Sequence, residues 1–178
     1  MNVERIINRA VLHKGAPISD VLGRIWINEA LDKLSTMYPK TACEVHSTYI
    51  EVSKETDVIP TPENTKAIFK ATNINGNIYK NYSIDVEGMQ FDMPGEYKIT
   101  YGKKPSDVSV NTETPKIHEG YHYAIACFVA SRELFELDPN HPRGQALEQE
   151  FYMEAEKTNN TLSFLKTHKR RTPARTWR

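Results

Sequence analysis

Residues 115–138 have the sequence PKIHEGYHYAIACFVASRELFELD, and the interpretation of the whole chain starts from this stretch. Between Tyr121 and Ala130 almost every residue is apolar or aromatic, so a helix here has no wide polar face to turn toward water. A helix that is apolar on all sides is normally enclosed by its own domain. Pro115 can begin such a helix, and Pro139 follows its end. We therefore predict a buried central helix over about residues 118–138.

Three further helices are predicted from apolar residues at helical spacing. The first covers about residues 3–13 and ends before Gly15. The second covers about residues 20–38, where Ser19 or Asp20 can cap it. We expect its apolar side chains to face the core: Leu22, Ile25, Trp26, Ala30, Leu31 and Leu34. The third covers about residues 142–165 and carries the stripe Leu147, Phe151, Ala155, Leu162 and Leu165.

Between the second helix and the central helix, the region of about residues 46–102 is rich in β-branched and aromatic residues, and apolar and polar side chains alternate in it. Asn75-Gly76 is a strong signal for a two-residue hairpin loop. Pro94-Gly95 separates residues 89–93 from residues 96–101 and predicts a second hairpin. We infer one small antiparallel sheet of four to six strands, inserted between two helical parts.

The predicted fold class is therefore α+β: a helical bundle around a central buried helix, an inserted small antiparallel β-sheet, and an extended basic C-terminal tail. A chain of 178 residues suits one domain and can bury roughly 70% of its unfolded surface. We expect that domain to span residues 1–166. Residues 167–178 have few core-forming side chains, and we expect them to be disordered on the free protein.

Charge is unevenly distributed along the chain. The formal net charge is zero, with 23 basic and 23 acidic residues, but the six basic residues from Lys166 onward have no acidic residue among them. The preceding part is therefore acidic, with 17 basic and 23 acidic residues. Such a basic tail suggests an acidic partner. The two cysteines and the lack of an N-terminal apolar segment favour a reducing cytoplasm, and no apolar run is long enough to span a membrane.

The tail has too little apolar surface to fold by itself. Full burial of Trp177 would contribute about 4–6 kcal/mol. Ordering about a dozen residues costs at least about 10 kcal/mol. We therefore interpret the tail as a docking segment that becomes ordered on a partner, or where many copies bind together. A solubilising terminus and a nucleic-acid contact remain alternatives, because clustered Lys and Arg also neutralise phosphates.

One segment suggests metal chemistry. His118-Glu119-Gly120-Tyr121-His122 fits the pattern H-E-x-x-H, in which two histidines one helical turn apart bind zinc and the glutamate acts as a general base. The motif lies at the first turn of the predicted helix, and no third ligand is obvious. A zinc-dependent hydrolase using His118 and His122 is therefore an alternative. The sequence has no Walker loop and no G-x-S-x-G, and we expect no catalytic residue and no cofactor.

Several segments together resemble the head-to-tail adaptor (head-completion or connector) proteins of tailed bacteriophages. The resemblance covers about residues 20–157 and is diffuse. It is carried by INEALDKLSTMYP at Ile27–Pro39, EYKITYGKKP at Glu96–Pro105, TPKIHEGYH at Thr114–His122, Asp138-Pro139, and Phe151-Tyr152 in the last helix. In this interpretation the pair His118-Glu119 is incidental.

The resemblance implies a non-enzymatic protein that forms a ring, expected to be dodecameric, below the portal protein. Such a ring extends the channel through which genomic DNA passes without sequence-specific binding, and it offers the next surface to a tail, stopper or tail-completion protein. The implied location is the head–tail interface of the virion, after assembly in the host cytoplasm. Carried over by position, the portal-docking residues would be Arg170, Arg171, Arg175, Trp177 and Arg178.

Overall fold

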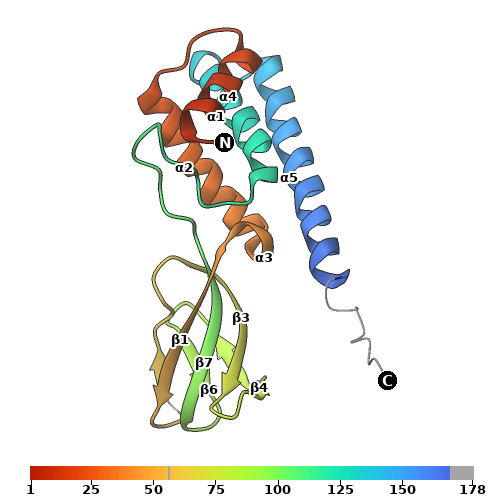
Figure 1. The fold of residues 1–178 in the computed structure, drawn as a ribbon. Helices are drawn as coiled ribbons and strands as arrows, with labels where there is room; N and C mark the ends of the chain where they lie inside the picture. Colours follow the sequence, from red (N-terminus) through yellow and green to blue (C-terminus); the bar gives the residue numbers. More distant parts are fainter. Residues whose placement is uncertain (56, 169–178) are drawn as a thin grey trace, which may run out of the picture. The chain divides into compact units, whose positions relative to one another are not determined.

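The structure is a computed structural model of the chain, and it describes residues 1–55 and 57–168. These residues form a mixed α+β fold with five α-helices, one short 3₁₀ helix and seven strands (Figure 1). They divide into two compact units. The helical unit comprises Met1–Leu34 and the described part of Ser106–Arg178, and the β unit comprises Ser35–Pro105. The inserted sheet that the sequence predicts is therefore a compact unit of its own.

Helix α1 spans Val3–Lys14, in agreement with the prediction. The Asn2 side chain caps its first turn by accepting a hydrogen bond from the backbone N–H of Arg5. Gly15 ends the helix in the left-handed conformation (φ 82°), and its N–H donates to the Val11 carbonyl. The apolar stripe of the helix is buried, with Val3, Ile6 and Ala10 fully enclosed.

Helix α2 spans Asp20–Met37, and a short helix α3 follows at Pro39–Ala42. The Ser19 hydroxyl accepts a hydrogen bond from the Leu22 N–H, as the capping prediction requires. The buried stripe consists of Ile27, Ala30, Leu31 and Leu34. The prediction for the first two turns is wrong, because Leu22 and Ile25 are 39% and 49% exposed. They lie off the i, i+3, i+4, i+7 stripe that starts at Ile27.

The central segment begins one turn later than predicted. A 3₁₀ helix, η1, spans Glu119–Tyr121, and helix α4 spans His122–Leu137. All residues from Ala124 to Ser131 are buried, as expected for a helix with no polar face. Helices α1 and α5 both pack against α4. The N–H of Asp138 donates to the Leu134 carbonyl and closes the last turn.

Helix α5 spans Pro142–His168 and lies beside α4 (Figure 1). Its first half is packed: Leu147, Phe151 and Ala155 are buried, and the Phe151 ring lies 5.0 Å from the Phe128 ring of α4 between centroids. The predicted stripe does not stay buried to its end, because Leu165 is 52% exposed. No helix of the described residues combines the length and apolar character that a membrane crossing requires.

The β unit contains two antiparallel sheets where the sequence predicted one. The four-stranded sheet has the order β1 (Glu44–Val52), β7 (Gly95–Lys103), β3 (Thr65–Asn73) and β4 (Ile78–Tyr79). The three-stranded sheet has the order β2 (Val58–Ile59), β6 (Met89–Phe91) and β5 (Tyr82–Ile84).

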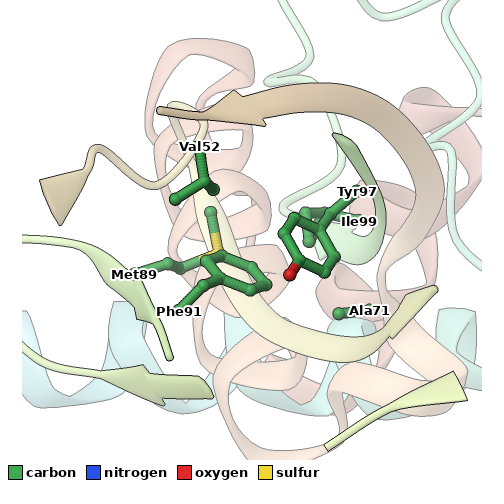
Figure 2. Close-up of a cluster of buried hydrophobic side chains, with 6 residues drawn as sticks. All are labelled: Val52, Ala71, Met89, Phe91, Tyr97 and Ile99. Atoms are coloured by element: carbon green, nitrogen blue, oxygen red, sulfur yellow. The ribbon is translucent and has the colours of Figure 1, made fainter. Parts of the chain in front are cut away.

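The two sheets share one apolar core (Figure 2). Met89 and Phe91 extend from β6 toward side chains of the larger sheet, which are Val52, Ala71, Tyr97 and Ile99. The rings of Phe91 and Tyr97 stack at 4.4 Å between centroids. Burial raises the pKa of the Tyr97 hydroxyl, which donates a hydrogen bond to the Met93 carbonyl. The core is thus centred on one aromatic stack between the sheets.

Two turn predictions need correction. The loop at Asn75-Gly76 is longer than two residues: the N–H of Asn73 donates to the Asn77 carbonyl, and the Asn73 side chain accepts from the N–H groups of Asn75 and Asn77. Only Gly76 has a positive φ (78°), whereas a two-residue type I′ turn needs two such residues. The strands on either side of Pro94-Gly95 do not pair as a hairpin, since β6 and β7 belong to different sheets.

Candidate functional site

The predicted docking residues lie beyond the described part of the chain. Helix α5 ends at His168, and Arg170, Arg171, Arg175, Trp177 and Arg178 follow it in the sequence, outside the described residues. Their proposed role therefore depends on the sequence alone, and the helical unit supplies the element from which they continue.

His118 is placed differently from the first histidine of a zinc-binding helix. It lies before the 3₁₀ helix as its N-terminal cap, and its Nδ1 accepts a hydrogen bond from the Gly120 N–H at 3.1 Å. The side chain is exposed. His118 and His122 therefore do not occupy successive turns of one α-helix, which is the arrangement that the H-E-x-x-H pattern requires.

His122 is buried at the start of α4, with 2% of its surface exposed. Its Nδ1 lies 2.9 Å from the N-terminal amine of Met1, and its Nε2 has no hydrogen-bond partner. Burial lowers the pKa of His122 to about 4, and the positive N-terminal amine adds to this shift. The ring is consequently neutral near pH 7. Within residues 1–55 and 57–168 no group of three His, Cys, Asp or Glu residues is arranged to hold a metal ion.

A polar cluster links α1, α4 and α5. The Tyr123 hydroxyl donates to Oε1 of Glu150, while the Arg9 guanidinium lies 4.5 Å from the centre of the Tyr123 ring. The hydrogen bond to Glu150, followed by burial, raises the pKa of Tyr123. Burial also raises the pKa of the neighbouring Cys127 thiol to about 12. Because a nucleophilic cysteine reacts as its thiolate, this cluster joins three helices and does not present an activated thiol at neutral pH.

A second polar contact joins α1 to α4. Nζ of Lys14 lies 3.0 Å from Oε2 of Glu133, and the two side chains are only 10% and 9% exposed. The Lys14 ammonium also donates to the Pro17 carbonyl, while Oε1 of Glu133 has no hydrogen-bond partner. A buried pair of this kind fixes which groups face each other more than it stabilises the fold.

The β unit has two exposed features, which are the outward side chains of β1 and a groove at the opposite edge of the larger sheet. Strand β1 alternates between half-buried and exposed residues, and Tyr49 is 74% exposed. Beside β4 and β5 lies a shallow groove of about 430 Å³. Its lining residues are Phe69, Lys70, Ile78, Tyr79, Lys80, Tyr82 and Ile84. None of these groove residues is a candidate site residue in the sequence, because the groove depends on which strands lie side by side.

No protein-family model matches this chain, and no curated protein matches it.

Proposed function

We propose that this chain is a structural head-to-tail adaptor of a tailed bacteriophage, and that it performs no catalysis. One observation carries the proposal: the segments that resemble adaptor proteins coincide with the junctions between elements. Ile27–Pro39 ends α2 and begins α3, Glu96–Pro105 forms β7 and leaves the sheet, and Thr114–His122 leads into η1 and α4. The resemblance is thus concentrated in the segments where one helix or strand ends and the next begins.

In this proposal the helical unit is a bundle organised around α4. Its packing supports that role, because α1 and α5 cover α4 and Phe151 of α5 contacts Phe128. Tyr121, within the resembling segment, is fully buried, so the segment contributes to the core of the unit. A firm bundle is what a spacer needs, since it must hold its shape while partners attach to both of its ends.

The basic C-terminal segment would dock on the portal protein through Arg170, Arg171, Arg175, Trp177 and Arg178. A single segment with one aromatic anchor binds weakly, because the free-energy cost of ordering its backbone exceeds the gain from burying one tryptophan. Copies held in a common ring share one platform, and their combined binding exceeds that of one copy by orders of magnitude. We propose a dodecameric ring at the head–tail interface of the virion, assembled in the host cytoplasm.

The ring would continue the DNA channel and present the β unit to a tail, stopper or tail-completion protein. An acidic body suits this task, because DNA must slide past it without binding. The 17 basic and 23 acidic residues that precede the last six basic residues agree with such a body.

The proposal is tested by mixing the chain with purified portal rings and measuring co-sedimentation. The full chain should bind, and a chain ending at residue 168 should fold normally but lose binding, because only the docking segment is removed. Equal binding by both chains would reject the docking role. Salt-dependent DNA binding that disappears with the same truncation would instead favour a nucleic-acid-binding accessory protein.

A further inference from the structure

Strand β1 is a long edge strand that lacks the usual protection of sheet edges. It pairs with β7 along all nine residues from Glu44 to Val52 without a register shift. Among the described residues, no strand pairs with its other side. Natural edge strands are commonly protected by proline, by charged side chains (lysine above all) or by a β-bulge, whereas the sequence EVHSTYIEV has no proline and no lysine, and its acidic residues Glu44 and Glu51 lie near its two ends. Its open side therefore offers unpaired backbone groups over roughly 30 Å.

The outward side chains of β1 combine apolar surface with negative charge. Val45 and Tyr49 are 61% and 74% exposed, and Glu51 follows them on the same face. Glu51 lies directly opposite Glu96 of β7, and both are exposed. Like charges in opposite positions of two strands destabilise the pair. Lys98 of β7 lies opposite Tyr49, with its Nζ 5.6 Å from the centre of that ring. Among the described residues, the unpaired negative charge is therefore at the Glu51–Glu96 end of the strand, where a cation supplied by a partner would offset the repulsion.

The opposite edge of the same sheet has complementary properties. Strand β4 has only two residues, and the groove beside it continues to β5. Ile78 and Ile84 expose 66% and 49% of their surfaces there. The charged residues of the groove lining are Lys70 and Lys80, and both are exposed. One edge is thus apolar and acidic, and the other is apolar and basic.

We propose that the β1 edge of one copy docks into the β4–β5 groove of the next copy. The occupant is a second copy because each edge offers the charge that the other lacks, and both belong to one unit of one chain. An interface between two different patches is head-to-tail, so repeated association gives a ring when the rotation closes. The biological role of this contact rests on the proposed function. The contact itself is inferred from the charge and the apolar surface of the two edges.

The test uses two charge reversals in the full chain, Glu51→Lys and Lys80→Glu. Sedimentation velocity should show that the unaltered chain associates with rising concentration and that each reversal alone weakens association about tenfold. An equimolar mixture of the two variants should recover association, because each altered edge then meets its complement in the other variant. Contact between identical edges would respond to only one of the two reversals, because the other reversal leaves that edge unaltered.

Two control variants, Glu63→Lys and Lys116→Glu, make the same charge changes at exposed positions that belong to neither β1 nor the groove lining. They should associate like the unaltered chain. A chain that stays monomeric over the whole concentration range overturns the proposal, as does a mixture that behaves like the single variants. Portal binding is measured separately, so a chain that associates but does not bind portal rings refutes the proposed function while leaving this contact intact.

Discussion

The helical unit is built around one helix that is buried along most of its length, whereas the larger sheet of the β unit is covered mainly on one face. In α4, eleven of the 16 residues are buried, including Ser131 and Glu133. In β1, every second residue is exposed along nearly its whole length, and among these is Tyr49. The helical unit thus buries the apolar residues of its central helix in its own core, whereas the β unit leaves several apolar residues of its strands exposed to solvent.

The largest effect is expected from a substitution in the helical core. Phe128 is fully buried against Phe151, so Phe128→Ala should destabilise the helical unit by about 3–5 kcal/mol. Urea denaturation followed by Trp26 fluorescence measures this in a Trp177→Phe background, where Trp26 is the only tryptophan. Leu137→Ala, at a position that is 74% exposed on the same helix, is the control and should change little. A cost below about 1 kcal/mol for Phe128→Ala would contradict the enclosed-helix account.

Acid should weaken the helical unit next. The pKa of His122 is lowered to about 4 by burial, so the unfolded chain binds a proton near the usual pKa of 6.5 before the folded chain does. Stability should therefore fall by up to about 3 kcal/mol as the pH drops from about 6.5 to about 4. The His122→Gln variant should lose most of this slope, measured as the urea midpoint at each pH. An unchanged slope would show that His122 is not held neutral.

In the β unit, a smaller effect is expected at Gly88. Its φ is 151°, and an added Cβ would lie 2.4 Å from the Ile59 carbonyl oxygen. Gly88→Ala should therefore cost about 1–3 kcal/mol, seen as faster amide hydrogen exchange at Ile99 in the core of the unit. Gly76→Ala is the matched control: Gly76 also has a positive φ, but an added Cβ would meet nothing within 4 Å. Equal costs at the two positions would contradict the close approach at Ile59.

The smallest effect has the opposite sign. Glu51→Lys replaces one member of the Glu51–Glu96 pair and should stabilise the β unit by a few tenths of a kcal/mol. The same substitution is expected to weaken association between copies. Thermal unfolding at low protein concentration isolates the first effect, with Glu63→Lys as the control. If Glu51→Lys lowered the stability of the isolated chain, the two carboxylates could not be described as an unfavourable pair.

The sequence was most informative where a local signal acts alone. Apolar spacing and the end signals Ser19 and Gly15 placed α1 and α2 within one or two residues, because these signals depend only on neighbours in the chain. The burial of α4 was also predictable, since its composition leaves no polar face.

The predictions failed where two distant segments decide the outcome. Pro94-Gly95 marks a turn, but no local signal shows that β6 and β7 enter different sheets. Similarly, Leu22 and Ile25 are apolar, yet the face of α2 that packs starts at Ile27. For the candidate site, the alternating residues predicted strands in this region but assigned no outward face. The free edge and the basic groove could not be foreseen, because both depend on the strand order.

Electron cryomicroscopy of the full chain mixed with portal rings tests the central claim most directly. The account predicts a closed ring of copies below the portal, with the C-terminal segment of each copy ordered on the portal and the β1 edge of each copy against the β4–β5 groove of its neighbour. Portal rings without attached copies, or single copies bound without contact to one another, would contradict it.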